Sequence, residues 1–134
     1  WNQLNAAGFD RSKPAIVVST GVSMYLTKEA NVATLEQVAA LAPRSTFAMT
    51  FMLALNHLGP TERSIMEFVM NKAHESGTPF LSLYSPEDML STANVCGFKK
   101  SQYISGEDIY QRYFADRTDG LRAGNAEAFL VAMT

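Results

Sequence analysis

The sequence contains a single cysteine, Cys96, and it has neither a long apolar run nor a cluster of basic residues. One cysteine excludes an internal disulfide and suits a reducing compartment, so we expect a cytoplasmic protein. No apolar stretch approaches the roughly 20 residues that a membrane-spanning helix needs. The net charge is -2 without a basic patch, which predicts partners other than nucleic acid or a membrane.

The motifs of several enzyme classes are also missing. The eight glycines are scattered singly, so the chain has no glycine-rich phosphate loop, and no G-x-S-x-G nucleophile elbow occurs. The two histidines, His57 and His74, have no cysteine or carboxylate at metal-ligand spacing, and both are interpreted as surface residues. The sequence therefore predicts no metal site, and it identifies no catalytic residue.

Four runs of apolar or alternating residues predict β-strands near residues 15–19, 46–52, 99–104 and 127–133. The first run is continuous and rich in β-branched residues, which is typical of a parallel strand buried on both faces. A helical segment joins the first two strands, so we expect a parallel βαβ unit with a right-handed crossover. No long crossover follows the final strand, and an antiparallel pairing of the last two strands is expected.

Helices are expected between these strands, because residues that cap helices occur there. Thr27 and Ser85 are good N-caps, and Ser105 followed three residues later by Asp108 matches a capping box. Gly97 is placed to end the helix that begins after Ser85. The order of strands and helices predicts an α/β fold, with two parallel strands, a terminal antiparallel pair, and helices packed on the sheet.

We expect residues 1–134 to form a single domain, since this length suits one modest core. The chain opens on Trp1 without a methionine, inside a helix-like segment that ends at Gly8. We interpret this start as that of a fragment of a longer protein.

The strand-to-helix segment "VVSTGVSMYLTKE", residues 17–29, is the first candidate for a site. In open α/β sheets, ligands bind beyond the carboxyl ends of the parallel strands, where Ser19, Thr20 and Gly21 are expected. A plain turn is the alternative, in which Gly21 serves the backbone geometry and Tyr25 packs on the following helix.

The second candidate is "RYFADRTDGLR", residues 112–122, which combines three arginines with two aspartates. One interpretation is a solvated loop with salt bridges from Arg117 to Asp116 or Asp119, and such composition alone favours it. In the other interpretation the stretch closes over a ligand.

Four segments remain to be considered together: residues 1–14, residues 19–27 ("STGVSMYLT"), residues 76–98 and residues 112–122. With these segments in this order, the sequence as a whole resembles the C-terminal half of class I S-adenosylmethionine-dependent methyltransferases. More narrowly, it is similar to the leucine carboxyl methyltransferase-like group, which includes many bacterial and mycobacterial proteins. The resemblance keeps the family's order of motifs over essentially the whole chain.

The resemblance implies that the four strands are the fourth to seventh of a Rossmann-like sheet, the last two forming an antiparallel hairpin at one edge. It also implies S-adenosyl-L-methionine as the cofactor and a small-molecule methyl acceptor as the partner. The implied site residues are Ser19, Thr20 and Gly21 for the cofactor and Tyr25, Arg112 and Tyr113 for the acceptor. The fork of an arginine would suit an acceptor that carries a carboxylate.

Two departures from the family pattern affect these expectations. The chain lacks the family's N-terminal half, which carries the glycine-rich loop and an acidic residue that hold the cofactor. Many relatives have a glutamate at the position of Thr20, whose hydroxyl carries no charge but can still form hydrogen bonds.

We therefore expect the full-length protein to methylate a carboxylate or hydroxyl of a small molecule, and this fragment alone to be inactive. The alternative is a non-catalytic remnant that acts as a dimerisation or interaction module. In that case a sheet edge left exposed beside the first strand would pair with a second copy or another partner.

Overall fold

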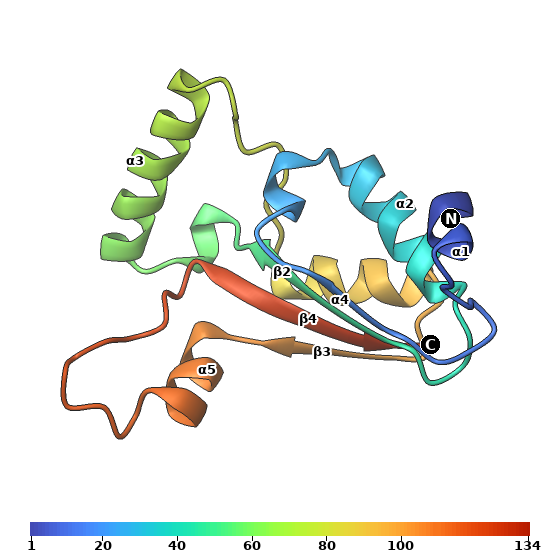
Figure 1. Cartoon of the computed structure of the whole chain (residues 1–134). Helices are drawn as coiled ribbons and strands as arrows, with labels where there is room; N and C mark the ends of the chain where they lie inside the picture. Colours follow the sequence, from blue (N-terminus) through green and yellow to red (C-terminus); the bar gives the residue numbers. More distant parts are fainter.

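Four strands form one mixed sheet with the order β1-β2-β4-β3 (Figure 1). The computed structural model describes all 134 residues. The strands are β1 (Ile16–Ser19), β2 (Thr46–Met52), β3 (Lys100–Ile104) and β4 (Glu127–Met133). Each begins and ends within one residue of the range expected from the sequence, and the α/β fold class is confirmed.

The pairing directions are also as expected. β1 and β2 run parallel, with Ile16 beside Thr46. β3 and β4 run antiparallel, and β4 also pairs antiparallel with β2 along its whole length. The last strand is thus inserted between β2 and β3, which leaves β1 and β3 as the two edges of the sheet.

Side-chain caps start three of the five helices. Thr27 Oγ1 accepts the N–H of Ala30 at 3.2 Å, and Ser85 Oγ accepts the N–H of Asp88 at 3.0 Å. Ser105 and Asp108 form both halves of a capping box. The helices are α1 (Asn2–Ala6), α2 (Lys28–Ala39), α3 (Pro60–Glu75), α4 (Pro86–Val95) and α5 (Gly106–Tyr113), with short 3-10 helices η1 (Ser23–Tyr25) and η2 (Leu55–His57).

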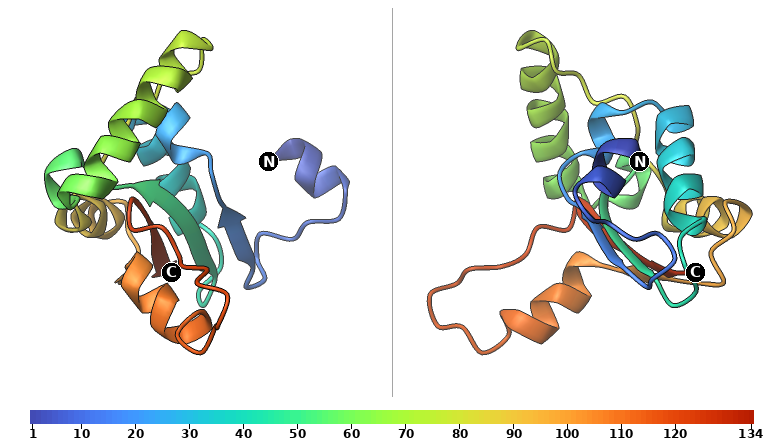
Figure 2. Two further views of the ribbon diagram at one scale, coloured as in Figure 1. Left: turned by 90° about the vertical axis from the view of Figure 1, so that its left-hand side faces the viewer. Right: turned by 45° about the vertical axis from the view of Figure 1, so that its right-hand side comes forward.

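The hydrophobic core lies on one face of the sheet, beneath α2 and α4 (Figure 2). Alternate residues of the two central strands point into it, as the period of a β-strand requires. Leu35 from α2 and Met89 from α4 pack against these strands. The strand residues in the core are Phe47, Met49 and Phe51 of β2 and Ala128, Leu130 and Ala132 of β4.

The other face of the sheet is largely open beside β1. Ile16 is 79% exposed and Val18 is 62% exposed. The expectation that this strand is buried on both faces is therefore wrong for this chain. The physical reason is that β1 forms an edge of the sheet and neither α2 nor α4 lies on the face to which these two side chains point.

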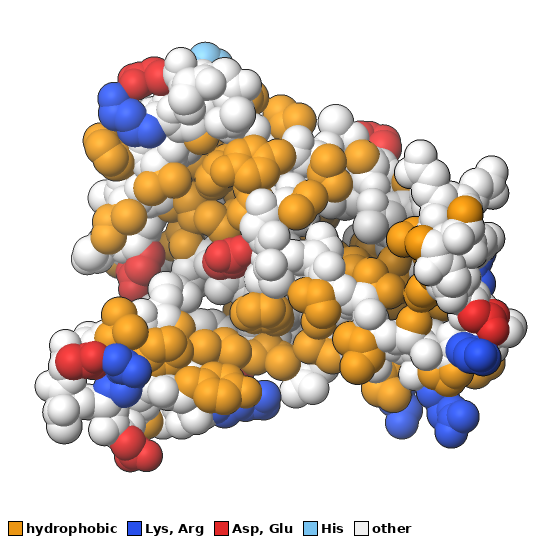
Figure 3. Space-filling view, in the orientation of Figure 1, with side chains coloured by type: hydrophobic (Ala, Val, Ile, Leu, Met, Phe, Trp, Pro, Cys, Tyr) orange, Lys and Arg blue, Asp and Glu red, His pale blue; other side chains and the backbone are white.

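Helix α3 projects away from the sheet and carries exposed apolar residues (Figures 1 and 3). Ile65 is 59% exposed and Phe68 is 63% exposed, whereas Met66 is the buried residue of this helix. The apolar side chains of this helix are therefore mostly not covered by the rest of the chain. None of the helices in the chain combines the length and hydropathy needed to cross a membrane.

Buried polar contacts hold the segment that follows β1. Asn31 is 2% exposed, and its Nδ2 donates to the backbone oxygen of Ser23 at 2.9 Å and to Tyr84 Oη at 3.1 Å. Ser23 Oγ donates to the backbone oxygen of Thr50 at 2.8 Å. The turn after β1 is therefore fastened to α2, to β2 and to the segment that leads into α4.

We expect Asn31→Ala to lower the free energy of unfolding by about 2 kcal/mol, because it removes a buried amide group whose two N–H bonds donate to two acceptors. Urea denaturation of the chain measures this loss. Asn94→Ala is the matched control, since Asn94 lies exposed on α4 and its substitution should change stability by less than about 0.5 kcal/mol. An equal loss in both variants would contradict a structural role for the Asn31 contacts.

Candidate functional site

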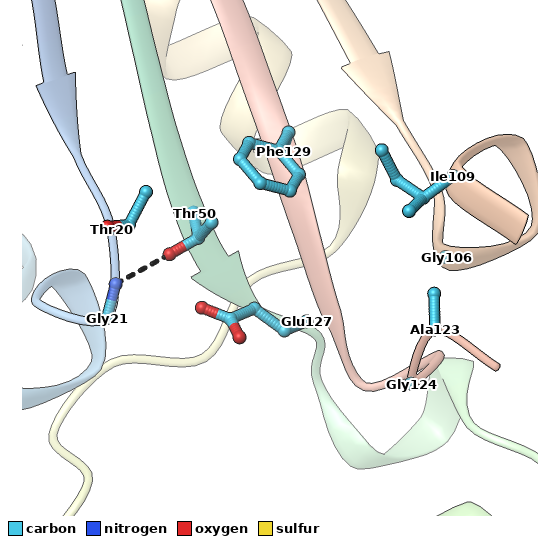
Figure 4. A pocket seen from close by; sticks show the side chains of 9 residues that line it. All are labelled: Thr20, Gly21, Thr50, Gly106, Ile109, Ala123, Gly124, Glu127 and Phe129. Carbon is cyan, nitrogen blue, oxygen red and sulfur yellow. Dashed lines mark hydrogen bonds between the residues drawn. The ribbon is translucent and has the colours of Figure 1, made fainter. Parts of the chain in front are cut away.

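A cavity of about 430 Å³ lies at the carboxyl ends of β1 and β2 (Figure 4). Thr20 and Gly21 line it from the end of β1, Thr50 from β2, and Glu127 and Phe129 from the start of β4. The β4 residues alternate with the core residues, so the cavity opens on the face of the sheet opposite α2 and α4. Its position agrees with the general rule for ligand sites in open α/β sheets.

The opposite wall of the cavity is formed by α5 and the loop that precedes β4. Gly106 and Ile109 contribute from α5, and Ala123 and Gly124 contribute from the loop. A Cβ at Gly106 would collide with the backbone oxygen of Gly124 and with Asn125. Glycine at this position therefore lets the first turn of α5 approach the loop and close this side of the cavity.

The turn between β1 and η1 is shaped by one hydrogen bond. The N–H of Gly21 donates to Thr50 Oγ1 at 2.8 Å, drawn as the dashed line in Figure 4. Gly21 has a φ of 68°, a left-handed conformation that favours glycine. Thr50 is 4% exposed, so its hydroxyl links the ends of two neighbouring parallel strands inside the protein.

The polar groups of the cavity are few. Thr20 and Thr50 bring hydroxyls, and Glu127 is the one charged residue of the lining. Figure 4 shows the carboxylate of Glu127 turned away from β4 and toward Gly21 and Thr50. Phe129 and Ile109 supply apolar surface beside these groups, as in pockets that hold a small organic molecule.

The structure brings together only part of the residues expected to bind cofactor. Thr20 and Gly21 line the cavity, whereas Ser19 is the last residue of β1 and does not reach it. Tyr25 lies in η1, where it is 45% exposed and packs edge-to-face on Phe80 with ring centroids 5.4 Å apart. Tyr25 thus packs on a residue outside the cavity, and its role toward an acceptor stays a prediction.

The expected acceptor residues on α5 also lie outside the cavity. Arg112 and Tyr113 are exposed at the end of the helix, and Tyr113 is 69% exposed. The helix starts at the cavity with Gly106, and six residues of α-helix span about 9 Å. Their proposed contact with an acceptor therefore remains a prediction.

The arginine-rich stretch between α5 and β4 forms local contacts within itself and with α5. Arg117 Nε donates to Asp119 Oδ1 at 3.0 Å, and this hydrogen-bonded guanidinium holds the pKa of the Asp119 carboxyl below its usual range. The guanidinium of Arg122 lies 4.2 Å from the centre of the Tyr110 ring. These contacts match the solvated-loop interpretation for Arg117 and Asp119.

Sequence reasoning did not identify Thr50, Glu127 or Gly106 as site residues. The apolar pattern of residues 46–52 predicts a strand and gives Thr50 no separate role, although a single hydroxyl near the carboxyl end of such a strand is a usable signal. Glu127 begins the last strand, and nothing in its local sequence indicates that β4 would lie beside β2. Gly106 follows the N-cap residue Ser105, and this pattern indicates only the start of a helix.

Comparison with a family model and with solved structures supports the resemblance stated from the sequence. Residues 1–39 match the model of the leucine carboxyl methyltransferase family. None of the curated proteins is similar enough to count as a match.

Among solved structures, a DUF574 family protein of Streptomyces avermitilis is 15% identical with a TM-score of 0.62, covering 94% of this chain and 46% of that protein. Phosphoethanolamine N-methyltransferase 2 of Haemonchus contortus is 16% identical with a TM-score of 0.56, and the match covers 94% of this chain and 34% of that protein. That structure is a complex with phosphomonomethylethanolamine and S-adenosylhomocysteine. The apo form of the S-adenosylmethionine-dependent methyltransferase SibL is 13% identical with a TM-score of 0.58, and the match covers 93% of this chain and 33% of that protein.

This chain therefore spans less than half of the length of each of these structures. At this level of identity the likeness concerns the fold, and it extends over nearly all of the chain. The chain has the fold of a segment of S-adenosylmethionine-dependent methyltransferases, and its first 39 residues are similar to the leucine carboxyl methyltransferase family.

Proposed function

We propose that this chain is the C-terminal part of an S-adenosylmethionine-dependent methyltransferase that transfers a methyl group to an oxygen of a small molecule. The observation that carries the proposal is the cavity at the carboxyl ends of β1 and β2, lined by Thr20, Gly21 and Thr50. Ligands of open α/β sheets bind at this place. The shared fold with methyltransferases and the family match over residues 1–39 support the same activity.

The residues present fit one side of a cofactor site. The Thr20 hydroxyl and the exposed backbone at Gly21 can receive a polar ligand at the strand ends. The chain has no glycine-rich loop, so the groups that would hold the rest of the cofactor must come from another part of the protein. S-adenosyl-L-methionine, when bound, supplies a methyl group on a sulfonium. The contribution of this chain is to align an acceptor in a partly enclosed cavity.

The interaction module remains a second candidate because of the open face beside β1. Ile16 and Val18 expose apolar surface next to an unpaired strand edge, which favours pairing with another chain or segment. In the methyltransferase proposal the missing part of the protein covers this face. In the alternative a second copy does, and the isolated chain would then form a homodimer. Sedimentation of the intact protein, with and without Val18→Lys, separates the two proposals, because the isolated chain exposes this face in either case.

The first functional prediction concerns cofactor binding. We expect the intact protein to bind S-adenosyl-L-methionine with a micromolar dissociation constant and the 134-residue chain to bind it at least about a hundredfold more weakly. The reason is that the chain supplies only one wall of the site. Calorimetric titration of both proteins tests this. Micromolar binding by the chain alone would contradict the proposed division of the site.

The second prediction concerns Thr20 in the intact protein. Thr20→Val keeps the shape of the side chain and removes its hydroxyl, so cofactor binding should weaken by about 1 kcal/mol, or roughly fivefold. Thr118→Val, in the exposed loop, is the matched control and should leave binding unchanged. Melting temperatures of both variants are measured alongside. A lowered melting temperature with unchanged affinity would assign Thr20 a structural role only.

A further inference from the structure

The charge of the cavity lining restricts which acceptors the site can hold. Its one charged residue is the acidic Glu127, and none of the lining residues is a lysine, arginine or histidine. The arginines of the neighbouring loop are engaged elsewhere, with Arg117 paired to Asp119 and Arg122 over the Tyr110 ring. A carboxylate acceptor would therefore lie beside a negative charge that none of these lining residues offsets, which is unfavourable.

The Glu127 carboxylate is free to bind a ligand. It takes part in none of the salt bridges of the chain. Side chains alternate between the two faces along β4, so Glu127 lies on the same face as Phe129. Figure 4 shows the oxygens of Glu127 directed into the space between β4 and the ends of β1 and β2. An ionised carboxylate only accepts hydrogen bonds, so its partner must be a donor.

We propose that Glu127 selects a methyl acceptor that carries a hydroxyl or an amine donor and no anionic group at the reacting end. The donor binds the Glu127 carboxylate, while Phe129 and Ile109 contact an apolar or aromatic body. This inference rests on the proposed function, since it names the acceptor class of the same cavity. The inference narrows the chemical class of the acceptor from a carboxylate or a hydroxyl to a neutral or cationic hydrogen-bond donor.

Three probes with the same phenyl body test the selection: phenethylamine, phenethyl alcohol and phenylacetate. Each is titrated into the chain, and the backbone amide NMR signals of Thr20, Gly21, Thr50 and Phe129 report binding in the cavity. We expect the amine to bind about fivefold more tightly than phenylacetate, the upper range for a partly exposed ion pair, with the alcohol between them.

Variants separate charge from structure. Glu127→Gln keeps the shape and removes the charge, so the preference for the amine should disappear. Glu127→Asp keeps the charge and should retain at least part of the preference. Glu36→Gln, an exposed carboxylate on α2 under the opposite face of the sheet, should behave as the unchanged chain. Equal or tighter binding of phenylacetate, or a preference that survives Glu127→Gln, would overturn the proposal.

A methyl-transfer assay of the intact protein distinguishes this inference from the proposed function. Transfer to a carboxylate oxygen would overturn the role of Glu127 and leave the methyltransferase assignment standing. If the preference for the amine depends on Glu127 but the intact protein transfers no methyl group, the role of Glu127 stands and the methyltransferase assignment is overturned. If Glu127→Gln lowers cofactor affinity and leaves the probe preference intact, Glu127 faces the cofactor, which also overturns the selection of acceptor.

Discussion

The hydrogen bond from the Gly21 N–H to Thr50 Oγ1 joins the two parallel strands at the point where the cavity begins. It depends on β1 and β2 being parallel neighbours, because only then do their carboxyl ends lie at the same edge of the sheet. Ser23 extends the connection by donating to the backbone oxygen of Thr50, and Asn31 fixes Ser23 in turn. The turn after β1 is therefore held by a buried chain of polar contacts, each of which would be costly to break.

The antiparallel insertion of β4 adds the other half of the site. Pairing with β2 places Glu127 opposite Met52, at the same end of the sheet as Thr50. The loop before β4 then returns to the start of α5, where Gly106 permits the close approach. The cavity is thus enclosed by the carboxyl end of β2, the start of β4 and the start of α5, although these elements are far apart in the sequence.

The two faces of the sheet have different roles in this arrangement. The face under α2 and α4 contains the core and is closed by Leu35, Met89 and the central strands. The opposite face contains the cavity and the exposed side chains of Ile16 and Val18. Exposed apolar side chains of this kind can mark a surface at which proteins make contacts. The chain spans less than half of the structures that share its fold.

The sequence by itself determined the strands and the capped helices, because alternation, β-branched runs and residues such as Thr27 and Ser105 act over a few neighbours. It also predicted the directions of two pairings, parallel for β1 with β2 and antiparallel for β3 with β4. It also placed Thr20 and Gly21 at the carboxyl end of a parallel strand, since a turn after such a strand is a local feature, and both residues line the cavity. Only the tertiary structure decided that Ile16 and Val18 are exposed, that Arg112 and Tyr113 lie beyond the cavity, and that Glu127 lies within it. These outcomes depend on which strand becomes an edge and where β4 inserts, and such long-range pairing leaves no signal in the residues on either side.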